Sequence, residues 1–384
     1  MNRVKTIGKL GLLGLLGLLL LSACYSYDEE QEKKAVLTIY VYPPSNPMIT
    51  RDAVGNITSS EEEKKIHSLQ IWIFVHDEPG QKVAYLNVPT AELPEADQGK
   101  YEIELPVWFT MSKPNVDVYV VANVTTENCG FTLHENTTKG DLETAVIRSD
   151  DFGLTNPVNS VPAQGLPMTG MLKNQPISGE APTLRVGTSN APATVRLMRI
   201  TSRVRFVFGR PQDANTPKLT IKEISLAAKS IPDVEYLMPD EVLPYHLPPN
   251  NYNTGGEKLW KEPYPVTTSC PSPSDFIYEQ SGAQDYENRV AKAITNGELS
   301  ALPPFYLRES DKIVNGTIKY EVDNKGTKSE KTAEFFMENA GDFARDHSWL
   351  VYAFYTDEAI LEVISVRVKP WQENDTPEYP VPNW

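Results

Sequence analysis

Cysteine and histidine are scarce in this chain of 384 residues, which contains three cysteines and five histidines. None of the histidines lies at helical spacing from a second metal ligand, and no cysteine pair has the spacing of a zinc site. A Gly-rich phosphate loop after a strand and a Gly-x-Ser-x-Gly motif are both absent from the sequence. The sequence therefore predicts a protein that is not an enzyme and that uses no metal and no cofactor.

One segment, Arg345-Asp346-His347-Ser348, does bring together the residue types of a catalytic triad. It directly precedes a stretch with the alternation of a strand, and neighbouring residues of a strand point to opposite faces. Their side chains therefore do not converge as a triad requires. We expect this segment to be a loop that caps a sheet.

Positive charge is also in short supply, with 36 Lys and Arg against 51 Asp and Glu and a formal net charge of −15. That balance repels nucleic acid phosphates and anionic lipid, so the sequence predicts no nucleic acid partner. Hydrophobic residues make up 40% of the chain, which is enough to bury packed cores. The length is typical of about two domains.

A long hydrophobic run occurs only near the N-terminus, from Leu10 to Leu21, and three basic residues precede it. The run is shorter than the ~20 residues of a spanning helix and is typical of a signal peptide, which we assign to residues 1–23. The sequence around its end, Leu-Ser-Ala-Cys, resembles the bacterial lipobox, in which the cysteine becomes acylated. We therefore predict lipidation of Cys24, with palmitate among the acyl chains; the alternative is a plain secretory signal followed by an incidental cysteine.

The two remaining cysteines, Cys129 and Cys270, lie far apart in the sequence and in loop-like surroundings. A single long-range disulfide and two free thiols are both compatible with this spacing.

Alternation with a period of two dominates the rest of the chain, and it predicts strands. The expected strands of a first block are residues 35–42, 66–75, 82–88, 101–108 and 116–121. Those of a second block are 193–208, 219–227, 317–322, 348–354 and 360–368. Two blocks of short strands predict an all-β fold of two antiparallel β-sandwich domains in tandem.

Helical periodicity is weak. We expect one helix over 139–147 with Thr138 as its cap and another over 286–294. Residues 156–192 are polar and rich in proline, and we interpret them as loop and linker. Residues 231–273 are low in aliphatic side chains and are interpreted as a long surface excursion.

The polar loop around Arg51 follows the first predicted strand. An exposed, flexible loop with one arginine is a natural site of proteolytic cleavage, although an ordinary linker would have the same composition. The strand before it could turn either of two faces to the core. One face is Val36, Thr38, Tyr40 and Tyr42, and the other is Leu37, Ile39 and Val41.

The C-terminal tail after Trp371 is too polar and proline-rich to be a central strand of its own domain. It nevertheless carries Tyr379, Val381 and Trp384 at spacings of two and three, roughly the pattern of side chains that enter successive pockets of a groove. A frayed chain end is the other interpretation.

Several motifs occur in an order that resembles the FimA-type fimbrillins, the type V pilins of lipoprotein-derived fimbriae. They are the lipobox, the Arg51 loop, Lys65-Ile66, and residues 118–123, 167–170, 195–200, 345–349 and 360–371. The chain departs from the family pattern in Asp346, where Asn is frequent, in Asp52, and in residues 231–300, which match no family motif.

This resemblance implies transthyretin-like sandwiches and a mechanism of assembly. A precursor anchored in the outer membrane would be cut between Arg51 and Asp52 by an arginine-specific protease. The first strand would then be lost, and a donor segment of another subunit, carrying Tyr379, Val381 and Trp384, would fill its place in an extracellular adhesive fimbrium. The implied divisions are 1–23, 24–51, 52–192 and 193–384: signal peptide, propeptide, N-terminal domain, and C-terminal domain with the donor segment.

The partners implied are other copies of this chain, related pilin subunits, and ligands on host or bacterial surfaces. One alternative is a fimbrial tip or anchor subunit. Another is a surface glycan-binding lipoprotein, for which the aromatic residues Tyr245, Tyr252, Trp260 and Tyr264 would stack on sugars.

Overall fold

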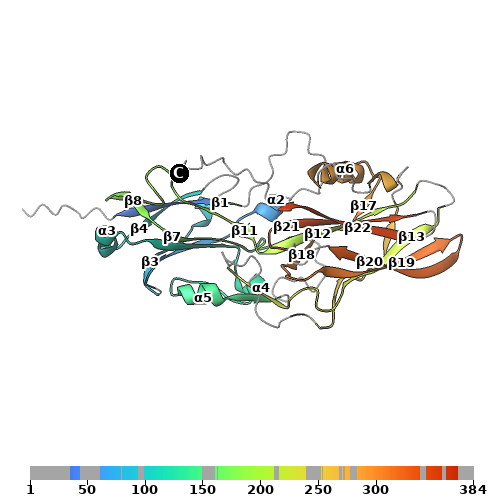
Figure 1. Cartoon of the computed structure of the whole chain (residues 1–384), viewed down its shortest axis with the longest axis horizontal. Coiled ribbons are helices and arrows are strands. Elements are labelled where there is room, and N and C mark those ends of the chain that lie inside the picture. The colour runs from blue at the N-terminus through green and yellow to red at the C-terminus, as the bar shows by residue number, and fades with distance from the viewer. Residues whose placement is uncertain are drawn as a thin grey trace, which may run out of the picture.

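A computed structural model describes most of the chain between Ala35 and Pro370. The described residues are 35–43, 61–78, 80–93, 99–148, 161, 163–211, 216–238, 252, 254–267, 270, 273–276, 283–337, 343–356 and 360–370. Figure 1 shows an elongated molecule in which two β-sandwiches lie end to end along the long axis. The all-β class and the sandwich architecture predicted from the alternation are confirmed.

The N-terminal sandwich packs two five-stranded sheets around one hydrophobic core. The first sheet contains β1 (Val36–Tyr42), β4 (Gly99–Glu104), β8 (Ile177–Glu180), β9 (Thr183–Val186) and β10 (Thr194–Arg196). The second contains β2 (Leu69–Val75), β3 (Lys82–Asn87), β5 (Val116–Ala122), β7 (Met168–Gln175) and β11 (Met198–Arg199). The central strand β5 is buried at every position because both of its faces are covered.

The C-terminal sandwich also has two five-stranded sheets. One contains β12 (Thr201–Gly209), β17 (Ser300–Ala301), β18 (Phe305–Arg308), β21 (His347–Tyr355) and β22 (Leu361–Pro370). The other contains β13 (Lys218–Leu226), β15 (Glu257–Trp260), β16 (Tyr264–Val266), β19 (Val314–Asn324) and β20 (Thr327–Met337). Phe206 meets Phe305 and Phe335 edge to face in the core between these sheets, which is the geometry that aromatic rings prefer.

Short helices cover the sandwiches. They are α2 (Glu61–Lys64), α3 (Val107–Ser112), α4 (Thr126–Cys129), α5 (Lys139–Thr144) and α6 (Ala283–Thr295), with 3-10 turns η1 (Thr90–Glu92) and η3 (Pro273–Phe276). Thr138 caps α5 in a reciprocal capping box with Asp141, as the sequence predicts. The second expected helix is α6, whose buried face covers the outside of β21. Among the described residues, no helix is long and apolar enough to span a bilayer.

Not every pairing is antiparallel. β1 runs parallel to both β9 and β10, and β12 runs parallel to β21. The sequence predicts antiparallel sandwiches. Side-chain alternation with a period of two is the same in parallel and antiparallel strands, so it cannot reveal these parallel pairs. The change from the first sandwich to the second falls between Arg199 of β11 and Thr201 of β12, slightly after the expected boundary at 192/193.

Four local predictions were wrong. The expected helix 139–147 ends at Thr144, and Val146–Arg148 form the short strand β6 instead. The expected strand 101–108 ends at Glu104, because Pro106 precedes helix α3 and its fixed φ favours a helix start. The expected loop 156–192 contains β7, β8 and β9, short strands interrupted by glycine and proline. The expected excursion 231–273 contains β14 (Val234–Tyr236), β15 and β16, and its Leu237 is fully buried.

Candidate functional site

Strand β1 occupies a central position in the first sheet. Along one edge it pairs antiparallel with β4, from Val36 opposite Glu104 to Val41 opposite Gly99. Along the other edge its first half pairs with β9 and its second half with β10. Removal of β1 would therefore leave a gap between two sheet edges whose backbone donors and acceptors had lost their partners.

Burial decides which side of β1 faces the core. Leu37, Ile39 and Val41 are all completely buried, whereas Tyr42 on the opposite face is 36% exposed. Of the two faces that the sequence left open, the aliphatic one is the inner face. Each of these side chains contributes about 1.5–3 kcal/mol by its burial, so a replacement strand needs apolar side chains at alternate positions.

The chain leaves β1 toward the junction of the two sandwiches, where the Tyr42 carbonyl accepts a hydrogen bond from the Leu197 N–H at 2.9 Å. Six predicted site residues lie outside the described residues: Cys24, Arg51, Asp52, Tyr379, Val381 and Trp384. The next described element after β1 is α2, so the predicted cleavage position lies between these two elements in the sequence.

Helix α2 is fixed to the C-terminal sandwich through Glu63, which is 2% exposed. Its carboxylate accepts a hydrogen bond from the Tyr306 hydroxyl at 2.6 Å and pairs with the Arg203 guanidinium at 3.3 Å. Its backbone carbonyl accepts a hydrogen bond from Arg199 Nε at 3.0 Å. Burial, and then the Glu63 carboxylate, raise the pKa of Tyr306, which keeps this phenol a donor. The segment that follows the predicted cleavage position is thus held at the junction.

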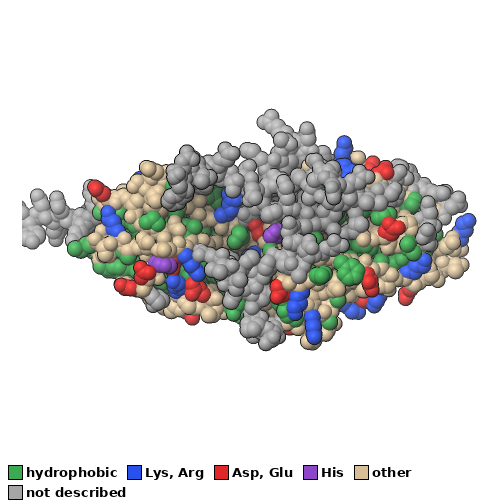
Figure 2. Space-filling view, in the orientation of Figure 1, with side chains coloured by type: hydrophobic (Ala, Val, Ile, Leu, Met, Phe, Trp, Pro, Cys, Tyr) green, Lys and Arg blue, Asp and Glu red, His purple; other side chains and the backbone are tan. Residues whose placement is uncertain are grey.

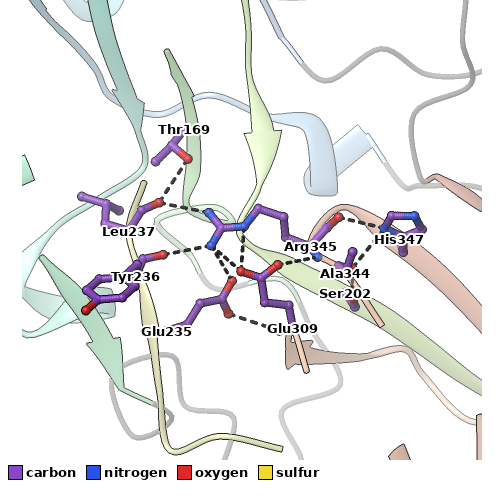
Figure 3. Close-up of polar contacts among 9 residues, drawn as sticks. All are labelled: Thr169, Ser202, Glu235, Tyr236, Leu237, Glu309, Ala344, Arg345 and His347. Carbon is purple, nitrogen blue, oxygen red and sulfur yellow. Dashed lines mark hydrogen bonds and ion pairs between the residues drawn. The ribbon is translucent and has the colours of Figure 1, made fainter. Parts of the chain in front are cut away.

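A second buried cluster at the junction is centred on Arg345 (Figure 3). Its guanidinium contacts Glu309 at 2.7 Å and Glu235 at 3.1 Å. It also donates to the backbone carbonyls of Tyr236 and Leu237, at 3.1 Å and 3.2 Å. A single side chain of the C-terminal sandwich therefore holds two carboxylates and the segment that follows β14.

That segment packs on the N-terminal sandwich. β14 pairs with β6 (Val146–Arg148), and the Leu237 carbonyl accepts a second hydrogen bond, from Thr169 of β7. Leu237 also belongs to the hydrophobic cluster around Trp72 on the outer face of the second sheet. Burial raises the pKa of Glu235, an effect that Arg345 opposes. The cluster therefore joins the sandwiches through both apolar and ionic contacts.

Of the predicted sheet-capping loop at 345–348, only Arg345 and Asp346 form a buried turn, and His347 and Ser348 already belong to β21. Asp346 lies 3.0 Å from Arg199 and is itself 4% exposed, while His347 opens β21 and directs Nδ1 to the Arg345 carbonyl at 3.0 Å. No triad forms among these described residues. The sequence does hold a signal for this junction, because Arg199 and Arg203 stand among the alternating residues of the expected strand 193–208 and a buried arginine needs a carboxylate partner.

Asp346 gives a pH dependence that can be measured. Its burial raises the pKa from 3.8 to about 6, although Arg199 opposes this rise. The native state therefore binds this proton more tightly than the unfolded state does, and the associated stability is present below pH 3.8 and lost as the pH rises through about 6.

In Asp346→Asn the amide oxygen still accepts from Arg199, but the group no longer titrates. The urea midpoints of the wild type and of Asp346→Asn, measured at several pH values between 4 and 7, test this pH dependence. The wild type should lose stability relative to the variant as the pH rises. A constant difference across this range would show that Asp346 titrates alike in both states.

The aromatic side chains of the glycan-binding alternative pack locally. Tyr264 donates to the Ala301 carbonyl and meets the ring of Trp260 edge to face. Tyr252 lies under the Lys312 ammonium, 3.5 Å from the ring centroid. Tyr245 lies outside the described residues.

Cys129 and Cys270, whose pairing the sequence left open, are both buried, and no disulfide joins them to each other.

Comparison with known proteins supports the fimbrillin resemblance. Residues 35–197, which contain the whole β1 environment, match the family model of the major fimbrial subunit protein (FimA). The resemblance predicted from the order of motifs is confirmed over this part of the chain. No curated protein matches the sequence.

Three solved structures illustrate what this chain is similar to. A candidate cell adhesion protein from Bacteroides eggerthii is 11% identical, over 87% of this chain and 95% of that one, with a TM-score of 0.46. The tip fimbrial protein Mfa3 from Porphyromonas gingivalis, with a C-terminal truncation, is 11% identical over 87% and 99%, with a TM-score of 0.45. A fimbrial assembly protein from Parabacteroides distasonis is 13% identical over 87% and 96%, with a TM-score of 0.38.

Proposed function

We propose that this chain is a structural subunit of a cell-surface fimbrium that is assembled by exchange of strand β1. The match of residues 35–197 to the major fimbrial subunit family supports a fimbrial role at the cell surface and association with other fimbrial subunits. The observation that carries the finer proposal is the position of β1. It is a central strand with an apolar inner face, and the predicted cleavage loop at Arg51 directly follows it in the sequence.

Cleavage between Arg51 and Asp52 would separate β1 covalently from the rest of the subunit. β1 could then leave without breaking the chain that runs from α2 onward, which Glu63 ties to the C-terminal sandwich. The exposed gap would offer unpaired backbone groups of β4 on one side and of β9 and β10 on the other. An incoming strand from another subunit satisfies such groups by β-augmentation, and its alternate side chains fill the vacated pockets.

The tail segment is our proposed donor. Tyr379 and Val381 are two residues apart, so in an extended conformation they point to the same face, as do Leu37 and Ile39 of β1. Pro380 lies between Tyr379 and Val381 and Pro382 follows them, and neither proline has an N–H to donate. Because N–H groups two residues apart point to the same edge of a strand, both missing donors would face the same neighbouring strand. The tail would therefore pair fully with only one of the two edges, and burial of Tyr379 and Val381 on one face would supply most of its affinity, while Trp384, three residues on, would turn to the opposite face.

Deletion of Tyr379–Trp384 is expected to leave a stable subunit that is still cleaved at Arg51 but does not elongate a filament. The deletion removes none of the described residues, so the fold should be unchanged. Polymer ladders on gels run without boiling measure the outcome, with Glu378→Ala as a control that keeps the apolar positions. Ladders of normal length from the deletion variant would place the donor elsewhere.

Anchoring of the precursor is the second part of the proposal. Cys24→Ala is expected to abolish incorporation of labelled palmitate and to prevent retention in the outer membrane, because no thiol remains for acylation at the end of the lipobox. Cys129→Ala is the matched control, since this buried thiol has no place in the lipobox. A Cys24→Ala variant that still incorporates palmitate would contradict the assignment.

Electron microscopy of cells that express the chain tests the proposed function as a whole. We expect filaments that contain this subunit along their length. Labelling confined to one end of a filament would assign the chain to a tip or anchor position, and cells that carry the protein without filaments would contradict a stalk subunit.

A further inference from the structure

Helix α3 lies at the end of the N-terminal sandwich that is farthest from the C-terminal one (Figure 1). Its outer side carries Val107, Trp108 and Met111, which are 58%, 39% and 84% exposed. Among the described residues, only seven large apolar side chains stand exposed, and these three share one short helix. Figure 2 shows hydrophobic side chains on the surface at this end of the molecule.

The helix is held rigidly, so this apolar face is a fixed feature of the surface. Phe109 on its inner side is fully buried in the core of the N-terminal sandwich. Pro106 precedes the first turn, and Lys113 ends the helix in a left-handed conformation while its ammonium donates to the Gly179 carbonyl at 2.8 Å. An apolar face that the fold holds out to solvent is typical of an interaction surface.

The N-terminal end of β1 lies beside this helix. The Leu105 N–H, just before α3, donates to the Ala35 carbonyl at 2.9 Å, and Val36 pairs with Glu104. Only residues 25–34 separate Ala35 from Cys24. Ten residues reach at most ~35 Å when extended, so a lipid on Cys24 confines this end of the molecule to the neighbourhood of the bilayer.

We propose that the α3 face, defined as Val107, Trp108 and Met111, contacts the lipid surface in the anchored precursor. This proposal rests on the proposed lipidation of Cys24. Tryptophan favours the membrane–water interface because its ring is apolar and its N–H is polar. Three side chains alone bind a bilayer weakly. The lipid-bearing tether of residues 25–34 makes the contact intramolecular, so the effective concentration of the α3 face at the bilayer rises to roughly millimolar.

The charges around the α3 face favour a zwitterionic surface over an anionic one. Glu104, three residues before the helix, and Glu180, next to the Gly179 that accepts from Lys113, stand exposed, and the chain as a whole is acidic. No basic cluster exists among these described residues to attract anionic headgroups.

Contact at α3 would orient the precursor. β1 runs from the α3 end toward the junction over seven residues, a length of ~20 Å at about 3.3 Å per residue. The loop that carries Arg51 would thus begin away from the lipid surface, where a soluble protease reaches it. Cleavage would release the subunit from its lipid and from the α3 contact together.

The test uses the chain from Cys24 onward, coupled through this thiol to a maleimide lipid in phosphatidylcholine vesicles that contain brominated acyl chains. The buried thiols of Cys129 and Cys270 are poor competitors for the reagent, and Cys24→Ser is the control for coupling. We expect brominated lipid to quench a component of the tryptophan fluorescence. Trp108→Phe should lose that component, and Trp260→Phe in the C-terminal sandwich should keep it.

Trp108→Phe removes the fluorescent probe itself, so a second variant is needed that disrupts the lipid contact and keeps the Trp108 fluorescence. Met111→Glu retains Trp108 but places a charge on the α3 face, so it should abolish the Trp108 quenching, whereas Ile313→Glu, at an exposed apolar position of the C-terminal sandwich, should not. Equal quenching in the wild type and Trp108→Phe would overturn the proposal. So would sedimentation showing that the α3 face joins two copies instead. Because the coupling is chemical, neither result depends on natural acylation, which palmitate labelling tests separately.

Discussion

Replacement of Arg345 by methionine is expected to lower the free energy of unfolding by about 3–5 kcal/mol, the usual cost of breaking a buried ion pair by removal of one partner. The substitution leaves the carboxylates of Glu235 and Glu309 buried without their cation. It also removes the donors to the carbonyls of Tyr236 and Leu237. Because this cluster joins the two sandwiches, we expect loss of cooperativity between them as well as loss of stability.

Urea denaturation monitored by fluorescence measures the effect. Arg185→Met is the matched control, since Arg185 stands exposed on β9 and its loss should change the stability by no more than about 0.5 kcal/mol. The triple variant Arg345→Met, Glu235→Gln, Glu309→Gln removes the uncompensated charges and should recover part of the loss. Equal midpoints for Arg345→Met and the wild type would show that the junction does not depend on this cluster.

Substitution of Arg51 by alanine is expected to abolish filament assembly while leaving a folded, lipid-anchored monomer. Without cleavage, β1 remains covalently attached and keeps both of its edges paired and its inner face buried. A donor strand then has no gap to enter. Electron microscopy and unboiled gels measure the polymer, and thermal unfolding of the purified monomer measures whether the fold is intact.

The variant Arg51→Lys sharpens this experiment. An arginine-specific protease does not cut it, so cells should again lack filaments. Brief treatment of the purified monomer with trypsin, which also cuts after lysine, should then permit polymerisation. Filaments from cells that carry Arg51→Ala would contradict the proposed processing, and failure of trypsin-treated Arg51→Lys to polymerise would show that cleavage alone is insufficient.

The sequence predicted the strands whose alternation is clear. Leu219–Ala227 and Ser348–Phe354 correspond closely to β13 and β21. β13 alternates between buried and less buried positions, whereas β21 is buried on both faces and is recognised by its run of apolar and aromatic residues. It missed β20, since this strand lies at a sheet edge and most of its residues are exposed. Alternation reflects burial, and an edge strand with little burial has little alternation.

The junction was less accessible to sequence reasoning. Glu63 is distant in the sequence from its partner Arg203, and Arg345 is distant from Glu235, so both contacts depend on how the two sandwiches pack end to end. Periodicity within a strand carries no information about that packing.

The environment of β1 was predictable in one respect and not in another. Its alternation identified two faces, but only the packed structure shows that Leu37, Ile39 and Val41 are the inner one.

N-terminal sequencing of subunits taken from purified filaments tests the central claim most directly. The account predicts that every assembled subunit begins at Asp52 and that no residue of β1 remains in the polymer. Assembled subunits that still carry Cys24, or that retain Val36–Tyr42 paired in their own first sheet, would contradict strand exchange at this site.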